Sequence, residues 1–347
     1  NTIHLFPILM EMRRFLQQFA LFALACGLLY PLVVVAFSIF LPLPYVKNVK
    51  HPLGGNGHMH TRLLELEGHG PVDVLFLGSS HTYRGFDPRI WEQRGYSSFN
   101  LGSSSQSPVQ TELLVKEYLD QLRPKLAVYE VYGVLGNLDG VESALDLIAN
   151  RKVDLASMEM VLRVRNMLAF NSMIYGTTRQ LLGVDQNFTE VRSIPPDRYI
   201  PGGYVQHEET TSDTSAAAGT TRGRLKVFQW HAFQRTIALF KERGVPVVLV
   251  EAPTTRSFHQ ELHATPSEVD QWFRAQPNFL DMNGVTGLAD STHFYDRHHL
   301  RQQGVILFNN ALIDSLAGRD LLPSPHVDAR RTNLGRSIMH RMLVNVR

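Results

Sequence analysis

Cysteine is nearly absent from this chain of 347 residues, whose one cysteine is Cys26. Because Cys26 lies within the most apolar segment, a disulfide framework, a cysteine zinc site and a cysteine nucleophile are excluded for the rest of the chain. An excess of charge of one sign is also lacking, since 34 Lys and Arg residues balance 32 Asp and Glu residues. Nucleic-acid-binding domains usually carry a strong positive excess, so nucleic acid is not an expected partner.

Charged residues are also missing between Arg14 and Lys47. The apolar run over residues 19–43 within this stretch is long enough to cross a hydrocarbon core of about 30 Å. We therefore expect a transmembrane anchor over residues 15–45. A cleaved signal peptide is the alternative, but this run is longer than the apolar core of a signal peptide, and no A-x-A-like cleavage site follows it.

Basic residues on the two sides of the apolar run bear on its orientation. Arg13 and Arg14 favour a cytoplasmic location for residues 1–14, whereas Lys47 and Lys50 on the far side oppose it. We expect a single-pass protein of the cytoplasmic membrane whose remaining residues lie on the extracytoplasmic, or periplasmic, side.

The chain after the anchor divides into a linker, one large domain and a tail. Residues 46–70 include the stretch "HPLGGNGHMH", which is typical of a solvated linker; a metal site at its irregularly spaced histidines is the alternative. The domain is expected over residues 71–318, with an amphipathic helical insertion at about 154–183 and a mobile loop at about 206–223. The basic tail at 319–347 either lies on an anionic membrane surface or packs as a peripheral helix.

Short apolar runs alternate with segments of helical periodicity within the domain. Parallel neighbouring strands need crossover connections, so this alternation predicts a mostly parallel sheet covered by helices on both faces. In such sheets the working site lies beyond the carboxyl ends of the strands. The expected strands lie at 72–77, 97–102, 125–135 and 245–253, and the expected helices at 107–122, 224–243 and 301–317.

Polar residues follow the first expected strand directly, in the sequence "GSSHTYRGFD" at residues 78–87. A serine is a weak nucleophile unless a base removes its proton and a third group holds that base in the right tautomer. Near the other end of the domain, Asp296 and His299 are three residues apart in "DRHHL". On a helical or tight-turn backbone this spacing puts the carboxylate and the imidazole on one face, as the acid–base half of a catalytic triad requires.

These motifs resemble those of the SGNH, or GDSL-like, hydrolase superfamily over roughly residues 72–317. "GSSH" resembles the nucleophile block, "NLG" at residues 100–102 the glycine block, and "DRHHL" the terminal D-x-x-H block. The resemblance implies a flavodoxin-like three-layer α/β/α domain in which Ser80 is the nucleophile, His299 the general base and Asp296 its orienting acid.

The expected anchor makes the chain similar to the membrane-tethered envelope branch of this superfamily, the DltD-like and alginate O-acetylation-like proteins. The resemblance implies a serine esterase or O-acyltransferase that acts on acyl esters of an extracytoplasmic envelope glycan. It also implies a polytopic membrane acyltransferase as a partner. No cofactor and no metal are implied.

Two departures from the superfamily pattern concern the oxyanion hole and the nucleophile block. Ser79 stands where an Asp commonly precedes the nucleophile, and Asn137 in "YGVLGNLDG" is at the wrong spacing for a G-x-N-D block. The backbone N–H groups of Ser80 and Gly102 are therefore the expected oxyanion donors. Further polar residues close to the two motifs are weaker candidates for substrate contacts: Ser79, His81, Tyr83, Arg84, Asn100 and His298.

Plainer interpretations exist for each motif. Ser79 or Ser80 could cap the next helix, and Asp296 could cap the last one. A second D-x-x-H sequence runs from Asp290 to His293, although it lacks the Leu that follows His299. For the whole chain, the alternative to an enzyme is a catalytically weak SGNH-like subunit that binds glycan or scaffolds a membrane acyltransferase complex.

Overall fold

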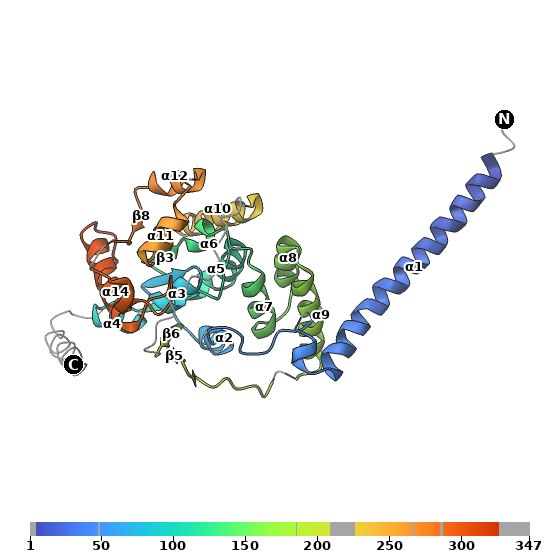
Figure 1. The fold of residues 1–347 in the computed structure, drawn as a ribbon, viewed down its shortest axis with the longest axis horizontal. Coiled ribbons are helices and arrows are strands. Elements are labelled where there is room, and N and C mark those ends of the chain that lie inside the picture. The colour runs from blue at the N-terminus through green and yellow to red at the C-terminus, as the bar shows by residue number, and fades with distance from the viewer. Residues whose placement is uncertain are drawn as a thin grey trace.

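The computed structural model describes residues 5–47, 49–184, 186–208, 226–265, 267–284 and 287–325. A single long helix, α1 (Leu5–Phe40), projects from a globular α/β domain (Figure 1). The part of the expected loop from residue 209 to 223 and the tail from residue 326 lie outside the described residues.

A five-stranded parallel sheet forms the centre of the domain. Its strand order is β2 (Ser98–Asn100), β1 (Val74–Leu77), β3 (Leu126–Glu130), β7 (Val247–Glu251) and β8 (Phe279–Asp281). Counted along the chain within this sheet, the order is 2-1-3-4-5, which is that of flavodoxin-like folds. The predicted mostly parallel α/β fold is confirmed, and β8 is an additional strand that the sequence did not indicate.

Helices cover both faces of the sheet, because successive side chains of each strand point to opposite sides. Leu75 and Leu77 of β1 pack in one core with α5 (Pro108–Leu122) and α10 (Val227–Glu242). Val74 and Phe76 pack in the other core with α4 (Pro88–Gln93) and α14 (Gln302–Ala317). The result is the expected three-layer α/β/α arrangement.

The expected helical insertion consists of α8 (Leu155–Val164) and α9 (Met167–Leu181), which follow α7 (Val141–Asn150). Met160 and Met173 belong to the domain core, as expected for a methionine stripe that serves packing. The α9 helix lies beside α1, and the Tyr30 hydroxyl donates to Asn171 Oδ1.

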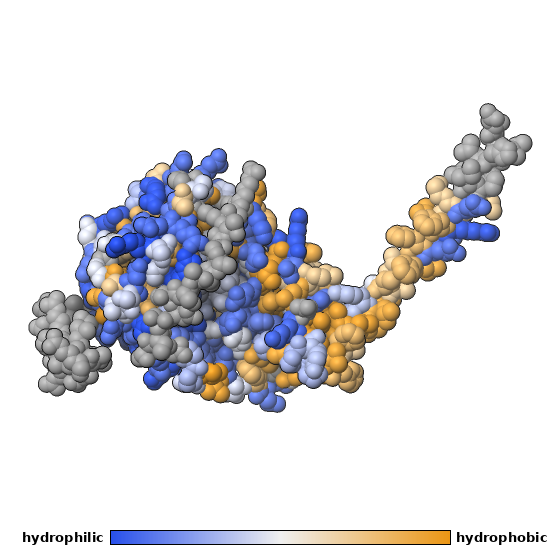
Figure 2. Space-filling view, in the orientation of Figure 1, coloured by the Kyte–Doolittle hydropathy of each residue, from blue (hydrophilic) through white to orange (hydrophobic). Residues whose placement is uncertain are grey.

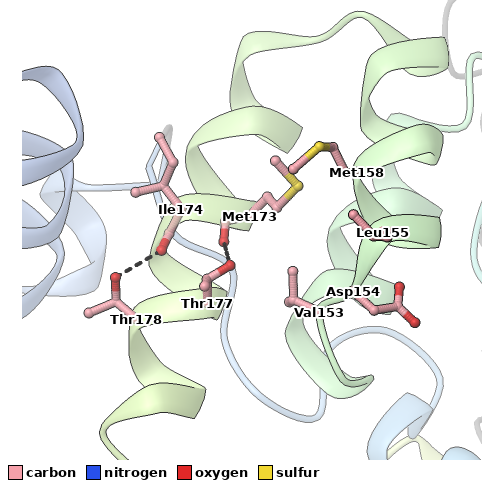
Figure 3. A pocket seen from close by; sticks show the side chains of 8 residues that line it. All are labelled: Val153, Asp154, Leu155, Met158, Met173, Ile174, Thr177 and Thr178. Atoms are coloured by element: carbon pink, nitrogen blue, oxygen red, sulfur yellow. Dashed lines mark hydrogen bonds between the residues drawn. The ribbon is translucent and has the colours of Figure 1, made fainter. Parts of the chain in front are cut away.

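Apolar side chains remain exposed on the outer side of this insertion. Leu155, Leu162 and Leu181 are 82%, 63% and 83% exposed, and apolar surface continues from this region onto α1 (Figure 2). A shallow pocket of about 600 Å³ lies between α8 and α9, with Met158 and Met173 facing each other across it (Figure 3). The pocket lining is largely aliphatic and holds no nucleophile–base pair.

Residues Met10–Phe40 are long and apolar enough to cross a bilayer, a property that membrane anchors and signal sequences share. The helix continues through Pro31. Proline is tolerated in apolar spans because neighbouring groups can satisfy the freed carbonyl.

The expected solvated linker is wrong over residues 59–67. The segment contains α2 (Met59–Glu67), whose Met59, Leu63 and Leu66 belong to the core. These three residues are spaced four and three apart, which puts them on one face of a helix, and this apolar face outweighs the Gly-rich composition before it. The histidines of the stretch have separate partners: His51 contacts Asp146, and the His60 ring packs on Phe188.

A small antiparallel sheet packs beside the edge strand β2. It consists of β4 (Ser193–Ile194), β5 (Asp197–Ile200) and β6 (Tyr204–His207), and the Asn100 N–H donates to the Gly202 carbonyl at 2.9 Å. Five short helices complete the described domain: α3 (Ser80–Gly85), α6 (Tyr132–Leu135), α11 (Arg256–Leu262), α12 (Glu268–Arg274) and α13 (Asp290–His293).

Candidate active site

A sharp bend at Gly78 places Ser80 beyond the carboxyl end of β1. Gly78 has a φ of +140°, and a Cβ atom there would lie 2.4 Å from Thr82 Oγ1 and 2.7 Å from the Glu130 carbonyl oxygen. Only glycine fits this backbone position without displacing its neighbours. Because α3 begins at Ser80, the serine hydroxyl stands at the edge of the sheet where ligands bind in α/β folds.

Asp296 organises the short loop that precedes α14. Its Oδ1 accepts hydrogen bonds from the backbone N–H groups of His298 and His299, both at 2.8 Å. Its Oδ2 lies 2.7 Å from His299 Nδ1. A β-bridge between Phe294 and Leu300 closes the base of the loop. These contacts fix the His299 ring with Nδ1 toward the carboxylate and Nε2 pointing away from it.

His299 Nε2 lies 2.8 Å from Ser80 Oγ, although the two residues are 219 positions apart in the chain. The structure therefore brings Ser80, His299 and Asp296 into one hydrogen-bonded series. The second D-x-x-H sequence lies elsewhere: Asp290 receives the Arg256 N–H, and His293 Nδ1 receives the Ala289 N–H.

Burial controls the protonation of this series. It lowers the pKa of His299 to about 4, because loss of solvent disfavours the imidazolium more than the Asp296 carboxylate favours it. His81 and Arg84 lower this pKa further. Burial would raise the pKa of Asp296, but the hydrogen bond with His299 outweighs it and holds this pKa below its ordinary value. At neutral pH His299 is neutral, which is the state that a general base needs.

The loop after β2 approaches α3 closely at Gly102. A Cβ atom there would lie 2.8 Å from Thr82 Cβ and 2.9 Å from the Ser79 carbonyl oxygen, so glycine permits the approach. The Gly102 N–H is 3.3 Å from Asn100 Oδ1, a long hydrogen bond that leaves this donor weakly engaged. The Ser80 N–H belongs to the first turn of α3, where backbone N–H groups lack partners within the helix.

Three of the residues expected to touch substrate are inside the protein. Ser79 and Asn100 are fully buried and Tyr83 is 2% exposed. Ser79 Oγ donates to Glu130 Oε2 at 3.2 Å, and Asn100 Nδ2 donates to the carbonyls of Thr82 and Phe86. The expectation of direct substrate contact is therefore corrected, because all three side chains are buried. Those of Ser79 and Asn100 hold the bend at Gly78 and the helix α3 in place.

Arg84 has a carboxylate partner within the protein. Its guanidinium donates to both oxygens of Asp197, at 2.8 and 2.6 Å, and Asp197 Oδ1 also lies 3.0 Å from His207 Nδ1. Burial would raise the pKa of Asp197, but these contacts with Arg84 and His207 outweigh it and lower that pKa. Instead of facing an anionic substrate, Arg84 joins α3 to β5 of the small sheet.

His81 and His298 contact each other, and their rings also lie next to the His299 ring. His81 Nε2 lies 2.9 Å from His298 Nδ1, and the His298 ring stacks on Phe258 of α11 with centroids 5.0 Å apart. Burial lowers the pKa of His298, and nearby His299 and His81 lower it further. His81 is 4% exposed, so it acts on the site through His298 rather than through substrate.

Glu130 and Arg62 are positioning residues that the sequence did not single out. Glu130 ends β3, is fully buried, and accepts the Ser79 hydroxyl and the Tyr132 N–H. Arg62 of α2 donates to the carbonyls of Gly57, Gly102 and Gly203. An acidic residue at the end of an apolar strand was a usable signal for Glu130; Arg62 carried none, because its partners are backbone atoms.

No protein-family model matches the sequence, and no curated protein matches it. The fold is similar to the crystal structure of a "putative acylhydrolase" from Bacteroides fragilis, with a TM-score of 0.39 and 11% sequence identity. The match covers 74% of this chain and 94% of that one. At this level of similarity the chemistry of the site rests on its own side chains.

Proposed function

We propose that the protein is a membrane-anchored serine esterase or O-acyltransferase that forms an acyl-enzyme on Ser80. The observation that carries this proposal is the 2.8 Å contact between Ser80 Oγ and His299 Nε2, with Asp296 Oδ2 2.7 Å from the other ring nitrogen. A neutral imidazole held between a hydroxyl and a carboxylate is the arrangement that activates serine in unrelated hydrolases.

In the proposed reaction, Ser80 Oγ attacks the carbonyl carbon of an acyl ester while His299 Nε2 takes the hydroxyl proton. The oxyanion of the tetrahedral intermediate accepts hydrogen bonds from the N–H groups of Ser80 and Gly102. Collapse breaks the bond to the leaving alkoxide, which takes the proton from His299. Water or a sugar hydroxyl then attacks the acyl-serine ester by the same route in reverse and regenerates Ser80.

Labelling with a fluorophosphonate probe tests the nucleophile. We expect the full chain to be labelled and Ser80→Ala to lose labelling. Ser291→Ala, which changes an exposed serine on α13, is the matched control and should label normally. Absence of Ser80-dependent labelling from correctly folded protein would reject the enzyme and favour the glycan-binding or scaffolding subunit. The missing G-x-N-D block is the observation that keeps this second candidate in view.

We propose an acylated glycan of the cell envelope as substrate and the extracytoplasmic face of the membrane as the location. The long apolar α1 and the exposed leucines of α8 and α9 support a domain that lies close to the bilayer, where it could also meet a polytopic acyltransferase. Analysis of envelope glycan esters after gene deletion distinguishes the two reactions: loss of esters indicates transfer, and accumulation indicates hydrolysis.

A further inference from the structure

A second group of titratable side chains lies at the carboxyl edge of the sheet, apart from Ser80. Glu251 ends β7, Asp281 ends β8, His259 lies on α11, and His263 is the C-cap residue of that helix, four positions later. Glu251 is 2% exposed, and the side chains of His259 and His263 are 26% and 14% exposed. None of these residues takes part in the proposed acyl transfer.

The ligand atoms of Glu251, His259 and His263 all lie within 4.8 Å of one another, and Asp281 lies at the edge of this cluster. Glu251 Oε1 lies 2.7 Å from His263 Nε2 and 3.5 Å from His259 Nε2, and Asp281 Oδ2 lies 3.7 Å from His259 Nε2. Ligand atoms around a tetrahedral zinc ion are about 3.4 Å apart, given metal–ligand distances of about 2.0–2.1 Å. His259 on α11 and His263 at its C-cap are four residues apart, a spacing at which two ring nitrogens can face one ion.

Two buried atoms of the group lack hydrogen bonds within the described residues. They are Glu251 Oε2 and His259 Nε2. A buried carboxylate oxygen without a partner loses its hydration with no compensation. A bound cation would compensate this oxygen. Behind the group, His263 Nδ1 lies 3.2 Å from Asp270 Oδ1 of α12, so a carboxylate orients the ring and leaves Nε2 to face Glu251.

We propose that Glu251, His259 and His263 bind one divalent transition-metal ion, for which Zn²⁺ is the probe. Imidazole nitrogens and carboxylate oxygens are the ligand types that such ions take, and binding displaces the proton between His263 and Glu251. Asp281 Oδ2 lies 3.7 Å from His259 Nε2 and 3.6 Å from Arg274 Nη1, so this carboxylate is shared with Arg274 and is left out of the proposed ligand set.

The ion would hold α11 against the end of β7. The same helix packs against the loop that carries Asp296 and His299, since Phe258 stacks on His298 and Glu261 pairs with Arg297. The proposed role of the metal is therefore structural: it fixes the helix on which that loop rests. It does not depend on acyl transfer by Ser80.

The test uses the full chain in detergent, without a polyhistidine tag, and measures retained zinc after dialysis, zinc affinity by calorimetry and melting temperature with and without Zn²⁺. We expect one Zn²⁺ per chain and a melting temperature that rises with Zn²⁺. His259→Ala and His263→Ala should lose both, whereas His231→Ala, at an exposed histidine of α10, should lose neither. Asp270→Asn should weaken binding roughly 10- to 100-fold.

Should the alanine variants fail to fold, Glu251→Gln and Asp270→Asn carry the same test, since each keeps the shape of the side chain. Zinc binding that these variants leave unchanged would overturn the proposal. It would equally be overturned if the native chain bound no zinc, or if Zn²⁺ left its melting temperature unchanged.

Discussion

The protonation of His299 is the property of the site that is most open to measurement at the scale of one residue. Its pKa is lowered to about 4 by burial, from an ordinary value of 6.5. A general base works only while it is neutral, so kcat/KM should stay constant as pH falls from 7 and decline only near pH 4. The measurement is hydrolysis of a chromogenic acyl ester across this range. A decline centred near 6.5 would show that His299 is not the base or is not buried.

Asp296→Asn tests whether Asp296 orients the His299 ring, because this change leaves the Ser80 hydroxyl in place. An amide can donate to His299 Nδ1 and so favour the wrong tautomer, and this type of change lowers kcat by roughly 10⁴-fold in serine hydrolases. Because Asp296 is the group that raises the His299 pKa, the residual activity should persist to a pH below about 4. Steady-state kinetics over pH check both effects. Nearly normal activity in this variant would mean that another group holds the imidazole.

At the scale of an element, the bend between β1 and α3 depends on Gly78, and a substitution there tests it. Gly78→Ala forces a side chain into a φ of +140° and against Thr82 and Glu130, at a cost of about 1–3 kcal/mol in the free energy of unfolding. Labelling of Ser80 should fall with it. Gly70→Ala is the matched control, because Gly70 is exposed and has open space at its Cβ position. Equal denaturation midpoints for the two variants would contradict the prediction.

Elements whose signal is local could be predicted from the sequence, and elements fixed by distant partners could not. Strands β1, β3 and β7 are continuous apolar runs because both of their faces are buried, and the runs alone located them. The strand expected over 125–135 is nevertheless too long, because residues 132–135 form helix α6. Strand β8 is three residues long, too short for any periodicity. The small sheet of β4 to β6 depends on contacts with β2, and α2 was hidden by the glycines that precede it.

The candidate site divides in the same way. Ser80, Asp296 and His299 lie in the short motifs "GSSH" and "DRHHL", and the order of these motifs along the chain fits an α/β fold with one site. The expected roles of Ser79, Tyr83 and Asn100 failed because proximity in sequence says nothing of burial, and that of Arg84 failed because Asp197 holds its guanidinium. The carboxylates that receive Ser79 and Arg84 are 51 and 113 residues away, so only the folded chain reveals them.

At the scale of the whole molecule, the presence or absence of α1 in the mature protein distinguishes an anchor from a cleaved leader. We expect the mature protein to remain in the membrane fraction after carbonate extraction and to keep residues 10–40. A chain that begins at residue 46 should leave that fraction. Mass analysis of the mature protein checks the first point and fractionation the second. A mature N-terminus beyond residue 40 in a soluble protein would contradict the anchor.

The connection between α1 and the domain is short and pinned on both sides. Lys50 Nζ donates to the Ser38 carbonyl at 2.7 Å, His51 Nε2 contacts Asp146, and the Gly54 N–H donates to Asn150 Oδ1. A domain held this way cannot pivot freely about the end of α1. With α1 in the bilayer, Ser80 would stay at a constant height above the membrane surface. Under the proposed function, encounters between Ser80 and its substrate would scale with the number of protein molecules per unit area of membrane. A polymer beyond that height would have to be carried to Ser80.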